Sequence, residues 1–503
     1  MFSSVRSATL TGIHGSPVAV EVHIGMGLPG FTIVGLPDEA CREARDRVRA
    51  ALLSSGCEWP NRKITVNLAP SSQRKAGAGL DLALAVGILA ATDQMKATDL
   101  ADFAFVAELG LDGSLRSVPG VAPLVSAVTD CRVVVAPPSH REARVAEPCE
   151  VLTARNLEQL VACLHRERPW ESVTDDDVDE DEIPPADMRD VRGQPMARLA
   201  AEVAAAGGHN VLFVGGPGGG KTMLAERIPG LLPPLDGRDA VDVTMVHSAA
   251  GLSLPRRGLV TRPPFRAPHH SASMIAMVGG GSGATMRPGE VSLAHAGVLF
   301  LDEVGEFMPS VLDALRQPLE SGEIRIARAN ATVTLPARFL LVGATNPCPC
   351  GGGGPGACVC SDTSRAKYLR RLSGPILDRF DLRIAVAATD PDDLLGVGDG
   401  ESSASIRERV VRARRLGVER AGKVNALLAA GELDTVAPLT EASRAVLRKE
   451  LEAGRLTGRG YHRVRRVALT LSDLAGACEP IGEEHVRSAL LMRTALAPNG
   501  AAQ

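Results

Sequence analysis

Four short, mainly apolar runs in the middle of the chain each adjoin a polar or glycine-rich segment. They occupy residues 210–214, 298–301, 339–344 and 382–385. Short apolar runs bounded by polar or glycine-rich segments are typical of buried strands. Together with the helix start that follows the first run, they predict an α/β core.

The segments on either side of this core have a different pattern. Residues 1–170 alternate short β-like runs with helical stretches. Acidic residues crowd positions 175–182, and such a run cannot bury apolar surface, so it predicts an exposed linker at 171–187. A second polar segment, at 390–403, separates the core from a helical C-terminal region.

The first apolar run leads into the most specific motif of the chain. Eight residues fit G-x-x-x-x-G-K-[ST] at every fixed position: Gly215, Gly216, Pro217, Gly218, Gly219, Gly220, Lys221 and Thr222. In this strand–loop–helix setting backbone N–H groups surround phosphates, Lys221 reaches the β and γ oxygens, and Thr222 ligates Mg²⁺. The motif predicts ATP and Mg²⁺ as cofactors.

The other runs supply groups for hydrolysis. The second run ends at Asp302 and Glu303, the Walker B arrangement, in which Asp302 holds Mg²⁺ through water and Glu303 polarises the attacking water. Asn346 follows the third run and is placed to orient that water or the γ-phosphate. Arg379 precedes the fourth run. In isolation it would more often be a surface ion-pair residue, but in this order of motifs we favour an arginine finger.

This order of motifs resembles the AAA+ ATPases in the branch of magnesium-chelatase and MCM-like motors, and more specifically the YifB/ComM family. The resemblance extends over nearly the whole chain, and the segments that carry it are 190–194 (Asp-Val-Arg-Gly-Gln), 264–270 (Pro-Phe-Arg-Ala-Pro-His-His), 278–281, 287–290, 346–351 (Asn-Pro-Cys-Pro-Cys-Gly) and 373–375.

The resemblance implies a fold in three parts. It predicts a Lon-protease-like (ribosomal S5 domain 2-like) α+β domain at 1–170, an α/β AAA+ P-loop core with a parallel sheet and a four-cysteine insertion at 188–390, and an α-helical lid at 391–503. It also implies a homo-hexameric ring with ATP bound between subunits, in which Arg379 reaches the nucleotide of the neighbouring subunit.

A lid of this kind is expected to supply a second sensor arginine. Arg459, in the segment 457–463, is the candidate for contact with the γ-phosphate. Family members tend to read Ala-Arg-Thr where this chain has Leu469 in the middle position, so Arg463 and Arg466 stay open as alternatives.

The Lon-protease-like fold can carry a Ser–Lys dyad, which raises a protease as a possible function. The family pattern places the nucleophile position at Gly79 and the lysine position at Ala122. Neither side chain can attack a carbonyl carbon or take a proton. We therefore expect no protease activity and interpret the domain as a substrate-guiding or ring-stabilising module.

Four cysteines cluster shortly after Asn346. Cys348 and Cys350 form one tight pair, Cys358 and Cys360 form a second, and a glycine-rich loop joins them. Four thiolates converging from two pairs suit tetrahedral Zn²⁺, although the C-x-C spacing is tighter than the usual C-x₂-C. Free thiols or a redox-labile pair are the alternatives. Structural Zn²⁺ is the favoured interpretation.

The motor has two candidate substrates. DNA is favoured by the family resemblance, which implies branch migration during recombination, and by a hairpin pattern at 323–334 whose Arg325 and Arg328 would grip phosphates. A protein partner, remodelled as by the magnesium-chelatase ATPase, is the alternative. Two Trp and two Tyr in the whole chain make an aromatic grip on polypeptide less obvious.

Charge and composition limit these functions only weakly. The formal net charge of −4 argues against a wholly basic nucleic-acid coat but not against a local basic channel. Only seven of the 55 basic residues are Lys, so a single Arg carries little information. The first residues lack the apolar core of a signal peptide and no run is long enough to cross a bilayer, which predicts a cytoplasmic protein with no membrane partner.

Overall fold

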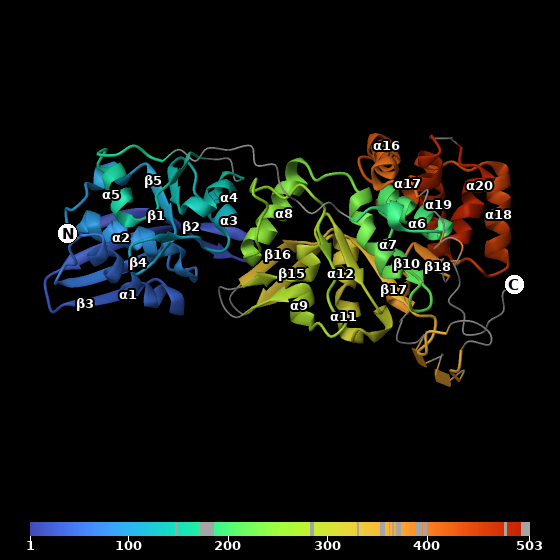
Figure 1. The fold of residues 1–503 in the computed structure, drawn as a ribbon, viewed down its shortest axis with the longest axis horizontal. Coiled ribbons are helices and arrows are strands. Elements are labelled where there is room, and N and C mark those ends of the chain that lie inside the picture. The colour runs from blue at the N-terminus through green and yellow to red at the C-terminus, as the bar shows by residue number, and fades with distance from the viewer. Residues whose placement is uncertain are drawn as a thin grey trace.

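The computed structural model places three regions along the long axis of the molecule, with the N-terminal sheet at one end and the C-terminal helices at the other (Figure 1). It describes the chain except for residues 146–148, 172–185, 282–285, 329–330, 353–357, 362, 365–366, 369–373, 388–389, 391, 393–394, 396–399, 477–479 and 494–503. Most of the predicted linker lies outside the described residues. Within the described part, no helix combines the length and the apolarity that a bilayer crossing requires.

The N-terminal region is built on a seven-stranded mixed sheet in the order β3-β4-β2-β1-β5-β8-β9. Helix α1 packs on it because its apolar residues recur at helical spacing, and Asp38 caps it by accepting a hydrogen bond from the Cys41 backbone at 2.8 Å. The elements are β1 (Phe2–Thr11), β2 (His14–Gly25), β3 (Gly30–Val34), α1 (Glu39–Ser54), β4 (Lys63–Ala69), α2 (Asp81–Ala91), β5 (Phe103–Val106), β6 (Glu108–Leu109), β7 (Leu115–Arg116), α3 (Val121–Ser126), β8 (Arg132–Val135), α4 (His140–Arg144), β9 (Val151–Thr153) and α5 (Leu157–Leu164).

The central region contains a five-stranded sheet in the order β11-β14-β17-β10-β18, and every pairing in it is parallel. This confirms the predicted parallel α/β core. Its strands are β10 (Val211–Val214), β11 (Phe265–Arg266), β14 (Val298–Leu301), β17 (Leu340–Thr345) and β18 (Leu382–Ala385). The helices around them are α6 (Pro195–Gly207), α7 (Lys221–Arg227), α8 (Gly237–Ala250), α9 (Met274–Val278), α10 (Glu290–Leu293), α11 (Pro309–Ala314), α12 (Arg316–Ser321) and α14 (Gly374–Leu377).

Two small hairpins extend from this core and lie against each other. They are formed by β12 (Gly279–Gly280) with β13 (Arg287–Pro288) and by β15 (Glu323–Arg328) with β16 (Ala331–Pro336). A Cβ placed on Gly279 would be 3.3 Å from the Ile326 side chain, which shows how closely the hairpins approach. The second hairpin is the one predicted at 323–334. The side chain of Arg328 lies outside the described part.

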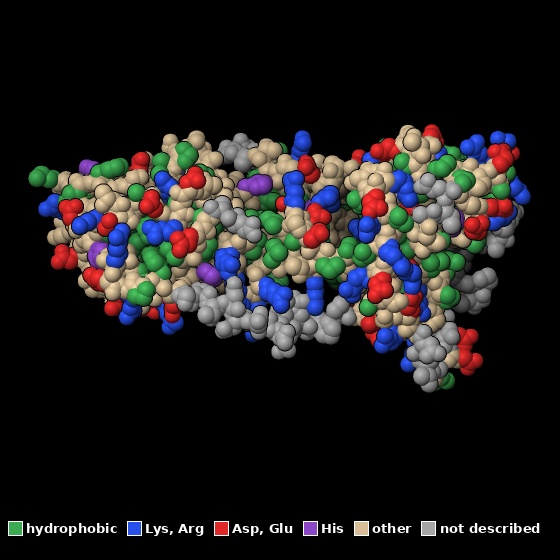
Figure 2. All heavy atoms as spheres, turned by 90° about the horizontal axis from the view of Figure 1, so that it is seen from above, with side chains coloured by type: hydrophobic (Ala, Val, Ile, Leu, Met, Phe, Trp, Pro, Cys, Tyr) green, Lys and Arg blue, Asp and Glu red, His purple; other side chains and the backbone are tan. Residues whose placement is uncertain are grey.

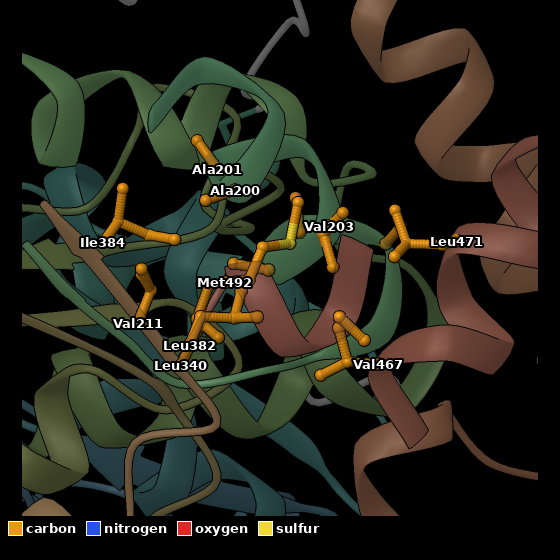
Figure 3. Close-up of a cluster of buried hydrophobic side chains, with 14 of the residues drawn as sticks. Ala200, Ala201, Val203, Val211, Leu340, Leu382, Ile384, Val467, Leu471 and Met492 are labelled. Atoms are coloured by element: carbon orange, nitrogen blue, oxygen red, sulfur yellow. The ribbon is translucent and has the colours of Figure 1, made fainter. Parts of the chain in front are cut away.

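The C-terminal region is helical, with α16 (Ser403–Ala421), α17 (Ala430–Val436), α18 (Glu441–Glu452), α19 (Gly458–Leu474) and α20 (Glu483–Leu491). It shares one apolar cluster with the sheet and with α6 (Figure 3). Val467 of α19 and Met492, which follows α20, are fully buried in that cluster beside Val211 and Leu382 of the sheet. The helical region therefore depends on the central sheet for its core.

The N-terminal region contacts the central one through α8 and the second hairpin. The Gly120 backbone donates a hydrogen bond to the carbonyl of Ser248 at 2.9 Å, and the Ser248 hydroxyl donates one to Glu142 at 2.5 Å. Ile13, in the turn between β1 and β2, is buried in the same apolar cluster as Val333 of β16. The two regions are thus joined by both polar and apolar contacts.

An arginine on α16 ties the helical region to the core. Arg409 donates hydrogen bonds to both carboxylate oxygens of Glu202 on α6, at 2.7 and 2.9 Å, and also pairs with Glu401. These hydrogen bonds from Arg409 are the main reason why the pKa of Glu401 falls from its ordinary 4.5 to about 2. The bound carboxylate is thus favoured in the folded protein.

We predict that this ion pair makes stability depend on acid pH. Because the folded-state pKa of Glu401 is depressed, its contribution is complete above pH 4.5 and is lost as the pH falls toward about 2. Glu401→Gln should lower the free energy of unfolding by about 1 kcal/mol at pH 6, because solvent screens this partly exposed ion pair, and by less at pH 3. Urea unfolding at the two pH values measures this. Glu408→Gln, an exposed carboxylate on the helix that carries Arg409, is the matched control, and an equal loss for Glu401→Gln at both pH values would contradict the assignment.

Candidate nucleotide-binding and hydrolysis site

The loop after β10 has a backbone shape that requires glycine. Gly218 and Gly220 have φ angles of +75° and +82°, which other residues adopt only with strain. A Cβ on Gly215 would overlap the carbonyl oxygen of Val386. The loop ends where α7 begins at Lys221, so the free N–H groups of the first helical turn face the loop.

Lys221 is buried inside this loop. Its ammonium group donates hydrogen bonds to the carbonyls of Gly215 and Gly216, both at 2.7 Å, and to Oδ1 of Asn346 at 3.1 Å. Burial lowers the pKa of Lys221, while the carboxylates of Asp302 and Glu303 act in the opposite direction. The predicted phosphate ligand and the predicted water-orienting residue are therefore in direct contact.

The two predicted carboxylates follow β14 at the same edge of the sheet. Oδ2 of Asp302 accepts a hydrogen bond from the Thr222 hydroxyl at 3.2 Å, which brings together the two predicted Mg²⁺ ligands. The Glu303 backbone donates to the other Asp302 oxygen at 2.9 Å and has a φ of +51°. Hydroxyl and carboxylate oxygens are the ligands that Mg²⁺ takes in protein sites, so this pair suits that ion.

These groups surround one pocket. Its volume is about 420 Å³, and it is lined by Pro217, Gly218, Gly219, Gly220, Lys221, Thr222, Met223, Asp302, Glu303, Thr345 and Asn346. The parallel register explains the assembly, since Thr345 lies opposite Val214 and Gly343 lies opposite Leu301. The carboxyl ends of three adjacent strands thus meet at one edge, which is the ligand-binding edge of open parallel sheets.

Sequence reasoning missed three residues at this edge. Thr345 lines the pocket, and its hydroxyl lies 3.2 Å from that of the buried Tyr368. Nδ1 of His270 lies 3.6 Å from Oε2 of Glu303. The Pro-Phe-Arg-Ala-Pro-His-His segment was a signal for His270, whereas nothing in the pattern around Tyr368 connects it with a strand 23 residues away.

Comparison with known proteins identifies the family. Residues 187–394 match the family model described as magnesium chelatase, subunit ChlI, and residues 20–139 and 400–493 match models of subunit ChlI and of its C-terminal part. The competence protein ComM of Haemophilus influenzae is 44% identical over 493 residues, covering 97% of this chain and 96% of that protein. YifB of Escherichia coli is 42% identical over 507 residues, covering 98% and 97%. The chain belongs to the ComM/YifB family of magnesium-chelatase-like ATPases.

A shorter match links this ComM/YifB chain to magnesium chelatase itself. The 38 kDa subunit of the Cereibacter sphaeroides enzyme is 38% identical over 60 residues, which is 12% of this chain and 18% of that subunit. The full-length matches and the pocket together support the AAA+ core that the motifs predicted.

Arg379, the predicted arginine finger, and Arg459, the predicted second sensor, both lie outside the pocket of their own chain. Arg379 pairs with Glu320 on α12, and neither it nor Arg459 is among the residues that line the pocket in the described structure. Arg459 is 82% exposed, with its guanidinium 3.8 Å from Asp378. Their roles in a ComM/YifB ring stay predictions.

The alternative lid arginines are held elsewhere. Nε of Arg463 lies 3.2 Å from Asp381, which also contacts the buried ring of His209 at 3.3 Å. Burial alone would raise the pKa of Asp381, but the hydrogen bond from His209 and the nearby arginines outweigh it and lower the pKa. Arg463 pairs with this carboxylate, the charge of Arg466 also helps to lower its pKa, and neither arginine is among the residues that line the pocket.

The four predicted cysteine ligands come together. The sulfur atoms of Cys348, Cys350 and Cys358 lie 3.4 to 3.6 Å from one another, and all four sulfurs, including that of Cys360, lie within 4.8 Å. The backbone N–H of Gly352 favours the Cys350 thiolate and lowers the pKa of that thiol.

A second group of donors does not suit a metal. Asp239, Asp242 and His295 bring ligand atoms within 4.8 Å of one another. Burial lowers the pKa of His295 to about 4, so the ring is neutral, and its Nδ1 accepts a hydrogen bond from the Arg338 backbone at 3.1 Å. The single ring proton is therefore on Nε2, which leaves no free nitrogen lone pair for an ion.

The positions of the expected protease dyad are both buried. Gly79 accepts a hydrogen bond from the Ala107 backbone at 3.2 Å, and the Ala122 backbone donates one to Glu142 at 3.2 Å. Neither residue offers a nucleophile or a base. The Lon-protease-like identity of this region and its lack of protease activity stay predictions.

We predict that Lys221→Ala removes ATP binding. The substitution deletes the only ammonium group among the residues that line the pocket, and charge-assisted hydrogen bonds to phosphate are strong, so the loss of affinity should be at least about 100-fold. Equilibrium binding of a fluorescent ATP analogue measures it. Lys423→Ala, which removes a lysine paired with Glu432 on the surface, should bind ATP normally. Retained ATP turnover in Lys221→Ala would contradict the assignment of this pocket.

Proposed function

We propose that this chain is the subunit of an ATP-hydrolysing ring motor that acts on DNA as a branch-migration helicase in recombination and transformation. The observation that carries the enzymatic part is the convergence of Lys221, Thr222, Asp302, Glu303 and Asn346 on one pocket. The DNA substrate rests on the competence protein among the relatives and on exposed arginines beside the core. A DNA substrate agrees with the predicted cytoplasmic location.

Each residue of the pocket has its own role in the proposed hydrolysis. The glycine-rich loop and Lys221 would bind the phosphates, and Thr222 and Asp302 would hold Mg²⁺, which would supply the positive charge that neutralises the phosphates. Glu303 accepts the proton of the attacking water, and Asn346 orients that water or the γ-phosphate. Asn346 already accepts a hydrogen bond from the Lys221 ammonium group, so the position of the Asn346 side chain depends on Lys221.

We assign Arg379 to the active site of the neighbouring subunit. Its guanidinium is held by Glu320 away from its own pocket, which is consistent with a group that completes a site only in a ring. A homo-hexamer would place one such arginine at each nucleotide. Arg459, exposed at the start of α19, is the proposed second sensor.

We predict that an Arg379→Ala subunit poisons mixed rings. Each variant subunit would leave a neighbour without its charge-stabilising group, a loss of about 10³-fold or more at that site, so turnover should fall faster than the fraction of wild-type chains. Steady-state ATP hydrolysis across mixing ratios measures this. Arg316→Ala, an arginine on α12 close to the same surface, is the matched control. A strictly proportional loss would argue against a finger that acts in trans.

The DNA contact is proposed for the paired hairpins. Arg325 of β15 and Arg287 of β13 are both exposed, and neither has an ion-pair partner among the residues that the structure describes. The hairpins approach each other at Gly279 and Ile326, and we propose that the two arginines contribute to one DNA contact. Lys and Arg side chains also gather over the middle of the molecule in Figure 2. Such a surface would bind the DNA backbone without reading sequence.

A protein substrate is the second candidate. Met26 and Leu28, in the turn between β2 and β3, are 97% and 89% exposed, which is uncommon for neighbouring large apolar side chains. They lie far from the pocket, in the N-terminal region. This surface would contact a polypeptide rather than DNA, as a chelatase-like remodelling ATPase requires.

We predict that DNA stimulates ATP turnover and that salt abolishes the stimulation. Wild-type turnover should rise several-fold with single-stranded or forked DNA at low salt, because phosphate contacts release counterions. Arg325→Ala should weaken DNA binding and lower the stimulated rate, whereas Arg448→Ala, an exposed arginine on α18, should change neither. Turnover that is indifferent to both DNA forms would reject the DNA motor and favour the protein substrate.

A further inference from the structure

The segment that carries the four cysteines contains almost no apolar side chains that could form a core of its own. Five of the seven residues between Cys350 and Cys358 are glycine, and the segment contains no large apolar residue except Val359. Val359 is 89% exposed, so it contributes no core. A glycine-rich loop of this kind loses much conformational entropy on ordering and needs a cross-link to offset that loss.

The arrangement of the sulfur atoms indicates what the cross-link is. Four thiolates around a tetrahedral Zn²⁺ ion lie about 3.8 Å from one another. Three of the separations observed here are 3.4, 3.5 and 3.6 Å, and the fourth sulfur is within 4.8 Å of the rest. Soft sulfur ligands in a set of four select Zn²⁺ over the hard cation Mg²⁺.

Both ends of this segment are attached to the catalytic edge of the sheet. At the first end, Cys348 is buried two residues after Asn346, the residue that binds the Lys221 ammonium group. At the second end, Tyr368 is buried against Gly305, just beyond Glu303, and its hydroxyl meets that of Thr345 at 3.2 Å.

The cysteine segment also touches the phosphate loop directly. Gly351, whose backbone donates a hydrogen bond to the Cys348 carbonyl at 3.0 Å, has a φ of +75° and is buried. A Cβ on Gly351 would be 2.8 Å from Cδ of Pro217, and one on Gly216 would be 3.1 Å from the Gly351 carbonyl oxygen. Two adjacent residues of the phosphate loop are therefore packed against the backbone that follows Cys350.

We propose that Cys348, Cys350, Cys358 and Cys360 bind one Zn²⁺ ion and that the resulting knuckle clamps the phosphate loop through Gly351. The ion would then act on ATP affinity from outside the pocket, by fixing Pro217 and Gly216 in the shape that receives the phosphates. This inference rests on the proposed use of the pocket for ATP, but it requires neither a ring nor DNA.

The metal site is tested first by metal content. Wild-type protein purified without chelator should contain about one Zn²⁺ per chain, released by an organomercurial reagent and quantified with a colorimetric chelator. Cys350→Ser, which changes an exposed ligand, should lose the ion, and Cys131→Ser, a half-buried cysteine of the N-terminal region, should keep it. Wild-type protein with four freely reactive thiols and no metal would overturn the site.

The clamp is tested by equilibrium binding of a fluorescent ATP analogue to the wild-type chain. Removing Zn²⁺ should weaken binding about tenfold, and added Zn²⁺ but not added Mg²⁺ should restore it. Gly351→Ala leaves every thiol in place, so it should retain Zn²⁺ and still weaken ATP binding about ten- to hundredfold through the overlap with Pro217. Gly454→Ala, at a positive-φ glycine with open space around it, is the control.

The outcomes separate this inference from the proposed motor. Native ATP affinity in the metal-free protein, or in Gly351→Ala with its metal bound, would overturn the clamp. Neither measurement includes DNA or turnover, so a failure of DNA stimulation leaves the clamp intact. Loss of ATP binding in Lys221→Ala alongside an unaffected metal-free protein would support the pocket and reject the clamp.

Discussion

The parallel register of β14, β17 and β10 is the constraint on which the rest of the site depends. Because Thr345 lies opposite Val214, β17 and β10 end at the same height. Asp302 follows β14 at that same edge, one strand further away. This spacing lets the Thr222 hydroxyl reach Asp302 while the Lys221 ammonium reaches Asn346. A slip of one residue in either pairing would separate these contacts and reverse the buried faces of the strands.

The packing of the helical C-terminal region against the sheet is a second constraint on the site. The helical region shares its apolar core with β18 and α6, so it cannot move independently of the strand that follows Arg379. Buried polar contacts strengthen the connection, since the His209 ring lies between Asp381 and Thr470 of α19, at 3.3 and 2.8 Å. Such a network is costly to leave half-satisfied, so its members tend to move as one body. A shift of the helical region would therefore displace the arginine that we assign to the neighbouring site.

The sequence alone was sufficient for the parts of this fold that depend on local pattern. The strands at 298–301 and 382–385, the hairpin at 323–334 and the glycine-rich loop all follow from apolar runs, alternation and backbone freedom, and the structure has them at those positions. Contacts between residues that are far apart in the sequence could not be predicted from local pattern. Tyr368 meets Thr345 across 23 residues of sequence, and Arg379 pairs with Glu320 across 59. No periodicity encodes either contact.

The N-terminal region illustrates how such long-range contacts bear on the function. The turn between β1 and β2 brings Ile13 into the cluster that supports β16, and Gly12 approaches the Val333 side chain closely. The hairpin that we assign to DNA is therefore packed on one side by a region for which we expect no protease activity. Buried side chains in close-packed contact transmit displacement because the interior has little free volume. We therefore infer that the N-terminal region would restrict how far the hairpin travels in the hydrolysis cycle that we propose, a mechanical role that requires neither a nucleophile nor a bound nucleotide.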